Sequence, residues 1–266
     1  MRKFSRSFFA AVLTLGIGTR SIAHAGSKQC SVQSGQQRVA LVELYTSEGC
    51  SSCPPADKWL SGLPASGLGP DKVVPLAFHV DYWDYIGWTD PFARPAYTRR
   101  QRDTAQLNSL RTIYTPQVVV NGRDFRHWYW ENRLRSTLER INRSPAGAKI
   151  SLSLHDINNL QLQARGKFAL LPQQYPHRTA AYIALYQNRQ SSTVSAGENA
   201  GKQLRHNYVV RELHGPFDIG KNGMIEIDQT IKLNPSWRQR DIGVAAFVQD
   251  QSNGDILQVV ARSLCK

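Results

Sequence analysis

The sequence lacks long apolar runs, low-complexity tracts and a second cysteine motif. Beyond the amino terminus, no run approaches the roughly eighteen apolar residues of a membrane-spanning helix, so we expect a chain that does not span a membrane. Basic residues are scattered, which indicates solubility and argues against a nucleic-acid partner. Only the stretch Arg94–Arg111 is dense in arginine, and we interpret it as a solvated helix face.

The amino terminus has the features of an export signal. Three basic residues lie within residues 2–6, the run 8–18 is apolar, and Ala23-His24-Ala25 supplies the small-x-small pattern of a cleavage site. The pattern predicts a signal peptide over residues 1–25 and a periplasmic or secreted protein. Removal of 25 of the 266 residues leaves 241, enough for two domains, and the net charge falls from +13 to +9 because four basic residues leave.

Cysteine is rare, and its number is even. The chain has Cys30, Cys50, Cys53 and Cys265, and an even count in an oxidising compartment suggests pairing. Cys50 and Cys53 are obvious partners. Cys30 and Cys265 lie near opposite ends of the exported chain, where residues fray unless they are tied down. We expect a structural disulfide between them; bonds to other chains are the alternative.

Residues 26–143 alternate between strand and helix patterns. Strands are expected over residues 38–46, 72–80 and 116–120, and helices over 56–63, 91–110 and 128–142. After the linker-like residues 144–147 the apolar period changes to two. About seven short strands follow within residues 149–266, separated by turn residues. The sequence therefore predicts an α/β domain over residues 26–143 followed by an all-β antiparallel sandwich-like domain over residues 149–266.

The sharpest motif is Cys50-Ser51-Ser52-Cys53, between a predicted strand and a predicted helix. Two intervening residues at a helix start let both sulfurs reach disulfide geometry, and the helix dipole favours a thiolate. We expect Cys50 on the solvent side as the nucleophile, and Cys53, more enclosed, as the resolving cysteine. A structural disulfide or half a zinc site is the alternative, although no second such pair accompanies the motif.

The Thr115-Pro116 pair precedes a buried-looking strand, where proline is awkward unless it occupies the first position. The order of elements resembles that of the thioredoxin superfamily, in which a cis-proline lies at this place and faces the cysteine pair. The resemblance implies that the Thr115-Pro116 bond is cis and lies beside Cys50 and Cys53. Thr115 and Pro116 would then position an extended substrate segment.

Aromatic residues follow the second predicted strand at its carboxyl end. Tyr82 and Trp83, together with Tyr85 and Trp88, are candidates for the wall of a substrate groove; a loop packed over the core is the alternative. His79 just before them is a weak candidate for a metal ligand with Cys50 and Cys53, in the manner of a copper carrier.

Glu198 and His206 in the second half have no third partner that would make a catalytic site. We interpret them as structural residues that stabilise a loop by hydrogen bonds or contact the first domain.

Three segments resemble a bacterial secreted family catalogued as domain of unknown function 1223, which is regarded as thioredoxin-like. They are residues 43–57 (ELYTSEGCSSCPPAD), 76–88 (LAFHVDYWDYIGW) and 114–122 (YTPQVVVNG), and the resemblance extends into the second half, where it includes residues 197–199 (GEN) and 206–210 (HNYVV). The resemblance implies a thioredoxin-like fold for the α/β domain. Of the thioredoxin features only Cys50, Cys53 and Pro116 carry over by position. The intervening Ser51-Ser52 departs from the Gly-Pro of thioredoxins, so their reduction potential does not carry over.

These patterns favour a thiol–disulfide oxidoreductase that acts on protein or peptide thiols and disulfides and needs no cofactor. Cys50 would attack and Cys53 would resolve the mixed disulfide. Two alternatives stay open at this stage. One is a non-enzymatic binding module of the envelope, in which the Cys50–Cys53 disulfide is structural. The other is a carrier of a metal ion such as copper.

Overall fold

Strands dominate the chain. A computed structural model describes, besides Met1, residues 29–158, 160–172 and 178–265, which hold three α-helices and fourteen strands. The helices are α1 (Pro54–Gly62), α2 (Pro95–Leu107) and α3 (Glu131–Arg143). The strands are β1 (Gln29–Gln33), β2 (Ala40–Thr46), β3 (Val73–His79), β4 (Gln117–Val120), β5 (Arg123–Asp124), β6 (Ala148–Asn158), β7 (Gln161–Leu170), β8 (Thr179–Gln187), β9 (Gln190–Thr193), β10 (Gln203–His206), β11 (Val209–Asp218), β12 (Met224–Lys232), β13 (Ile242–Asp250) and β14 (Ile256–Ser263).

Two expectations concern the membrane and export. The predicted signal peptide, residues 1–25, lies outside the described residues. Within the described part of the chain, no helix is both long enough and apolar enough to cross a membrane.

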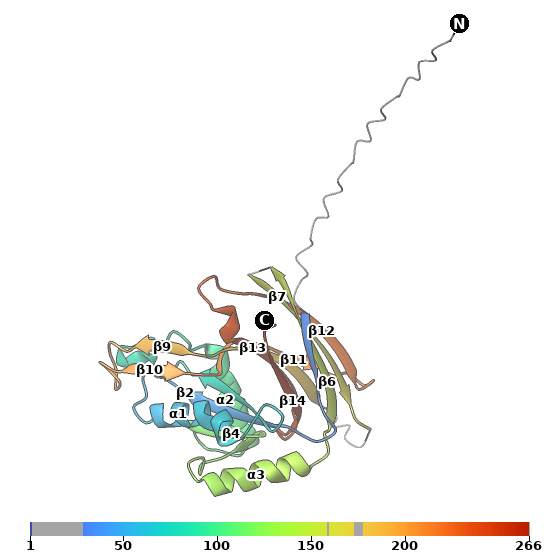
Figure 1. Ribbon diagram of the computed structural model, residues 1–266. Coiled ribbons are helices and arrows are strands. Elements are labelled where there is room, and N and C mark those ends of the chain that lie inside the picture. Colours follow the sequence, from blue (N-terminus) through green and yellow to red (C-terminus); the bar gives the residue numbers. More distant parts are fainter. Residues whose placement is uncertain (2–28, 159, 173–177, 266) are drawn as a thin grey trace.

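The strands form three sheets (Figure 1). The largest has eight strands in the order β14-β13-β8-β11-β3-β2-β4-β5, the second has the order β1-β6-β7-β12, and β9 pairs with β10. Strand β11 joins the two halves of the chain, because it pairs with β3 in parallel at Val209 and Ala77 and with β8 antiparallel. The predicted fold class, a thioredoxin-like α/β domain followed by a separate sandwich, is therefore wrong. Strands of both halves build one mixed sheet in a mostly β molecule.

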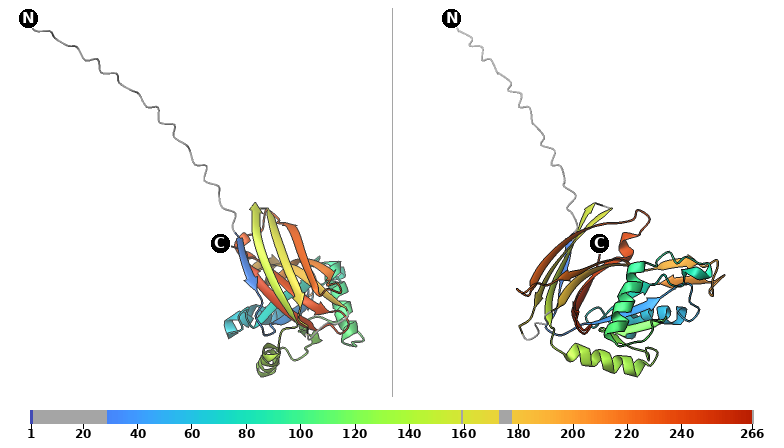
Figure 2. Two further views of the ribbon diagram at one scale, coloured as in Figure 1. Left: turned by 90° about the vertical axis from the view of Figure 1, so that its right-hand side faces the viewer. Right: turned by 180° about the vertical axis from the view of Figure 1, so that it is seen from behind.

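The apolar strands β8 and β13 explain this joined sheet. All nine residues of each are buried, so both faces of both strands need cover. Ala181, Ile183 and Leu185 of β8 pack against the four-stranded sheet, in one core cluster with residues of β6 and β7. The alternate residues Tyr182 and Ala184 face a second cluster on the opposite side, which includes Tyr97 of α2. The layers are visible in Figure 2.

In the first half of the chain, helices replace the second sheet as cover. Val42 and Leu44 of β2 lie in a third cluster with Leu60 of α1 and with Leu134 and Leu138 of α3. Leu41 and Tyr45, which alternate with them along β2, belong to the cluster that α2 covers. The eight-stranded sheet is thus covered on one face by α1, α3 and the four-stranded sheet, and on part of the other by α2.

Arg100 of α2 corrects the expectation of a solvated arginine face. Its side chain is buried, and its Nε donates to Glu43 Oε1 of β2 at 2.7 Å. The guanidinium lies 5.1 Å from the ring centroids of Tyr182 and Phe247, which come from the second half. Its neighbours Arg99 and Arg102 are exposed, as expected. Arg100 therefore connects the two halves on the face of the eight-stranded sheet that α2 covers.

The ends of the described chain meet beside the four-stranded sheet. Cys30 of β1 and Cys265, two residues after β14, form a disulfide with a Cα–Cα distance of 5.6 Å. Strand β1 pairs with β6 along five residues.

Candidate functional site

The cysteine motif lies in the loop between β2 and α1. Cys50 and Cys53 form a disulfide with a Cα–Cα distance of 5.5 Å, and Cys53 is the N-cap residue of α1. Pro54 and Pro55 occupy the first turn of α1, where a missing N–H disturbs no helical hydrogen bond. They also remove two donors from the helix N-terminus that would face a thiolate.

Both sulfur-bearing residues are buried. Cys50 is 1% exposed and Cys53 is fully buried, so the expectation that Cys50 lies on the solvent side is wrong. Only Ser51 and Ser52 between them are exposed. The Ser52 hydroxyl lies 3.3 Å from Cys50 Sγ, within hydrogen-bonding distance for sulfur. It is a polar group poised to stabilise a charge on that sulfur.

A loop from the second half of the chain holds the cysteine loop in place. Asn199 is fully buried, and its Nδ2 donates to the backbone oxygens of Glu48 at 2.8 Å and of Cys50 at 2.9 Å. Glu198 Oε2 accepts from the backbone N–H of Ser51 at 2.8 Å. Hydrogen bonds from Ser51 lower the pKa of the Glu198 carboxyl. We call residues 198–199 the clasp.

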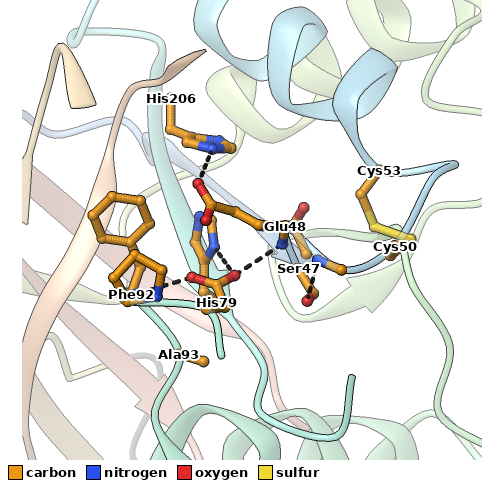
Figure 3. Close-up of polar contacts among 12 residues, drawn as sticks. Ser47, Glu48, Cys50, Cys53, His79, Phe92, Ala93 and His206 are labelled. Carbon is orange, nitrogen blue, oxygen red and sulfur yellow. Dashed lines mark hydrogen bonds and ion pairs between the residues drawn. A yellow bond between two sulfur atoms is a disulfide. The ribbon is translucent and has the colours of Figure 1, made fainter. Parts of the chain in front are cut away.

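A buried network of acids and histidines lies beside the cysteine loop (Figure 3). His206, at the end of β10, lies between Glu48 and Asp57: its Nε2 is 3.0 Å from Glu48 Oε1, and its Nδ1 is 3.3 Å from Asp57 Oδ1. The other oxygens of both carboxyl groups are also bonded. Thr46 Oγ1 donates to Asp57 Oδ2 at 2.7 Å, and Trp88 Nε1 donates to Glu48 Oε2 at 2.9 Å.

The two carboxyl groups determine the charge of His206. Burial alone lowers its pKa, but the hydrogen bonds to Asp57 and Glu48 and their charges outweigh burial and raise the pKa of His206 to about 10. The cause of this raised pKa is that a carboxyl oxygen faces each of the two ring nitrogens.

His79 and Asp90 form a second buried pair. His79 Nδ1 lies 2.7 Å from Asp90 Oδ2, which also accepts from the backbone N–H of Glu48 at 2.9 Å. Burial raises the pKa of Asp90, but the charge of His79 and these hydrogen bonds prevail, so the pKa of Asp90 is lowered. The second nitrogen of His79, Nε2, is buried and has no hydrogen-bond partner among the described residues.

The aromatic segment packs between the cysteine loop and the strand that starts after Pro116. Tyr82 and Trp83 are half-buried against the core cluster under α2, and Trp83 Nε1 donates to Thr115 Oγ1 at 2.7 Å. The Thr115-Pro116 bond is cis, as expected. It immediately precedes β4, whose Gln117 pairs with Tyr45 near the end of β2. Thr115, Trp83 and the cysteine loop thus share one edge of the sheet.

Sequence reasoning found the cysteines but missed their buried surroundings. Glu198 and His206 do contact residues of the first half, as the structural interpretation allowed. Asp57, Asp90 and Asn199 were not singled out. The one available signal was the position of Asp57, four residues after Cys53 in the first turn of the predicted helix.

Comparisons with known proteins place the chain in a family. The model of the family described as "Protein of unknown function (DUF1223)" matches residues 41–249. No curated protein gives a significant match. A crystal structure of an Agrobacterium tumefaciens protein is 24% identical, with a TM-score of 0.61 over 87% of this chain and 96% of that chain. HBP35 of Porphyromonas gingivalis is 15% identical, with a TM-score of 0.64 over 87% of this chain and 76% of that chain. These likenesses concern the fold alone, and none of them confirms the thioredoxin-like classification.

Proposed function

We propose that this chain, which belongs to the DUF1223 family of proteins of unknown function, is an exported thiol–disulfide oxidoreductase that works through Cys50 and Cys53. The observation that carries the proposal is the disulfide between these residues, which closes a two-residue loop between the end of a central strand and the start of a helix. Its substrates are protein or peptide thiols and disulfides.

The exchange proceeds in two balanced steps. A substrate thiolate attacks Cys50 Sγ, a mixed disulfide forms, and the Cys50–Cys53 bond breaks with the electron pair leaving on Cys53. A second substrate thiolate then attacks the substrate sulfur of the mixed disulfide and releases Cys50 as a thiolate. The substrate loses two electrons, which the cysteine pair gains, and the reverse sequence reduces a substrate disulfide.

Ser52 supports the role of Cys50 as the attacked and attacking sulfur. Its hydroxyl is the polar side-chain group that the structure places beside Cys50 Sγ, at 3.3 Å. A hydrogen bond to a charged sulfur is stronger than one to a neutral sulfur, so it favours the thiolate. This contribution matters because Pro54 and Pro55 leave the first turn of α1 with few N–H donors.

Substrate access requires the cysteine loop to open, because both cysteines are buried. The clasp holds the cysteine loop by three hydrogen bonds. We assign contact with the substrate segment to Thr115, Pro116, Tyr82 and Trp83, which share the sheet edge with the cysteine loop. Release of these three hydrogen bonds would free the cysteine loop to open toward a substrate segment.

The test is a redox titration of the folded protein in glutathione or dithiothreitol buffers, with alkylation and mass spectrometry of each cysteine. We expect Cys50–Cys53 to be reduced at a potential well above about −300 mV, the range below which structural bonds lie. Cys30–Cys265 serves as the internal reference in the same molecule. If both bonds are reduced together below that potential, the oxidoreductase proposal fails.

Trapping provides the second test. Expressed with its export signal, Cys53→Ser should accumulate mixed disulfides with substrates through Cys50, because the resolving attack is lost. Cys50→Ser should accumulate none. Absence of adducts that depend on Cys50 would contradict the proposal.

The burial of both sulfurs favours a second candidate, a non-enzymatic binding module in which Cys50–Cys53 is permanent. In that case the bond stabilises the loop that supports Glu48, and the aromatic segment contacts a partner. The same titration separates the two candidates, since a permanent bond stays oxidised wherever Cys30–Cys265 does.

A further inference from the structure

The buried histidines and acids beside the cysteine loop are not used by thiol–disulfide exchange. One potential ligand atom from each of Asp57, His79 and His206 lies within 4.8 Å of the other two, and all three residues are buried. They come from α1, β3 and β10, so the fold assembles them from three elements. The rings of His79 and His206 lie 5.0 Å apart, edge to face.

His79 has an unused nitrogen in this cluster. Its Nδ1 is engaged by Asp90 at 2.7 Å, and in the neutral ring that donates this proton to Asp90 the lone pair lies on Nε2. Nε2 is buried without a hydrogen-bond partner among the described residues. Because an unsatisfied buried nitrogen is costly, this lone pair indicates a missing electrophile. A histidine whose other nitrogen donates to a carboxylate is also the usual arrangement of a metal ligand.

His206 repeats the arrangement. Its Nε2 lies against Glu48 Oε1 at 3.0 Å, and its Nδ1 lies 3.3 Å from Asp57 Oδ1. Asp57 Oδ2 is oriented by Thr46. Each histidine therefore has a carboxylate behind one nitrogen, Asp90 behind His79 Nδ1 and Glu48 behind His206 Nε2. The other nitrogen of His206, Nδ1, faces Asp57 Oδ1, and a bound metal ion would replace the proton between these two atoms.

We propose that Asp57, His79 and His206 bind a divalent transition-metal ion, with zinc as the best match to the donor set. His79 Nε2, His206 Nδ1 and Asp57 Oδ1 would be the three protein ligands. Glu48 and Asp90 would orient the two imidazoles. Two imidazoles and one carboxylate, with a position left for a further ligand, form a common type of zinc site.

Charge and geometry are compatible with such an ion. Three carboxyl groups, of Glu48, Asp57 and Asp90, face two imidazoles in a buried space, so acids exceed bases and a dication improves the balance. Ligand atoms around tetrahedral zinc are about 3.3 Å apart for bonds of about 2.0 Å. The donor atoms lie within 4.8 Å of one another, so binding would draw them closer together to reach that spacing.

The test uses the mature protein with both disulfides intact, stripped of metal by a chelator and titrated with Zn²⁺ and separately with Co²⁺. We expect one ion per chain and a rise in the melting temperature with Zn²⁺. We also expect Co²⁺ to show the visible absorption of a four- or five-coordinate nitrogen–oxygen site without sulfur charge transfer. The proposal would be overturned if no stoichiometric metal binding were found, or if the Co²⁺ absorption bands showed thiolate ligation.

Variants locate the ion. His79→Gln should weaken Zn²⁺ binding at least 100-fold, and Asp90→Asn should weaken it about 10- to 100-fold through the orientation of His79. His155→Gln, in β6 away from the cluster, is the matched control and should bind like the wild type. Equal affinity of wild type and His79→Gln would overturn the proposal, and circular dichroism establishes that each variant is folded. The outcome is independent of the cysteines, since Zn²⁺ binding and disulfide reduction are measured separately.

Discussion

The Cys30–Cys265 disulfide joins residues 235 positions apart, whereas the Cys50–Cys53 disulfide joins residues three positions apart. The first bond is half-buried at the edge of the four-stranded sheet, where it ties β1 to the end of β14. The second is buried at the seam of the two halves, in contact with a clasp from distant sequence. The two disulfides of this molecule thus differ both in the length of the loop they close and in their burial.

The difference shows that the contribution of a disulfide to stability depends on the length of the loop it closes, and that its reactivity depends on its surroundings. In the chain-entropy model, a loop of 235 residues stabilises the folded state by about 5 kcal/mol and a loop of three by about 2 kcal/mol. Cys30–Cys265 therefore acts mainly on the unfolded chain. Cys50–Cys53 contributes less to stability. It differs from Cys30–Cys265 in its polar surroundings, which are the Ser52 hydroxyl and the clasp.

The largest effect should follow removal of the long-range bond. Cys30→Ser combined with Cys265→Ser should lower the free energy of unfolding by about 5 kcal/mol, because the unfolded chain regains the entropy of an open loop. Urea denaturation followed by circular dichroism measures this loss. Thiol exchange at Cys50 should stay intact in the same variant, and its loss would contradict the separation of roles.

Removal of the short-range bond should cost less. Cys50→Ser combined with Cys53→Ser should lower the free energy of unfolding by about 2 kcal/mol, since only a three-residue loop is opened. The same urea titration applies, with the Cys30/Cys265 variant run beside it. A loss as large as that of the long-range variant would show that Cys50–Cys53 is chiefly a structural bond.

The clasp offers a finer change. Asn199→Ala removes the two hydrogen bonds to the backbone of Glu48 and Cys50. Two such bonds contribute about 1–2 kcal/mol to the closed state, so reduction of Cys50–Cys53 by dithiothreitol should accelerate about tenfold. Reduction of Cys30–Cys265 should be unchanged. The control is Asn253→Ala, whose side chain bonds only its local turn at Asp255; an equal acceleration there would contradict a specific role of the clasp.

The smallest effect concerns Ser52. In a Cys53→Ser background, Ser52→Ala should slow alkylation of Cys50 by iodoacetamide about threefold, because one hydrogen bond to the thiolate is lost. Ser51→Ala is the control at the neighbouring residue, since Ser51 interacts with Glu198 of the clasp through its side chain and its backbone N–H. Equal rates in all three proteins would exclude Ser52 as a stabilising group.

The positions of most elements were predictable, and their pairing was not. The expected helix over residues 128–142 corresponds to α3, and the expected strand over 72–80 contains β3. Local periodicity indicates which face of a strand is buried but says nothing of which strand lies beside it. The pairing of Val209 of β11 with Ala77 of β3 merges the two halves. These residues are 132 positions apart in the sequence, and no local pattern encodes their pairing. The long apolar stretches within β8 and β13 are the one sequence feature that indicates a sheet covered on both faces.

The site was predictable only where its residues are neighbours in sequence. The spacing of Cys50 and Cys53 carries its own chemical meaning, and so does a proline at a strand start. The network of His206 with Glu48 and Asp57 depends on the strand pairing that merges the halves, so His206 looks isolated in the sequence. The burial of Arg100 likewise follows from Tyr182 and Phe247, which lie far along the chain.

The bond between Cys30 and Cys265 closes almost the whole described chain into a covalent ring. A protease that cuts one peptide bond inside that ring, for example at the exposed Lys221 or Asn222, opens the ring and releases no fragment. The nicked molecule keeps both sides of the cut on one covalent framework, and the sheet that they share can stay assembled. The ends of the chain, usually the first place to fray, become the point that holds a damaged molecule together.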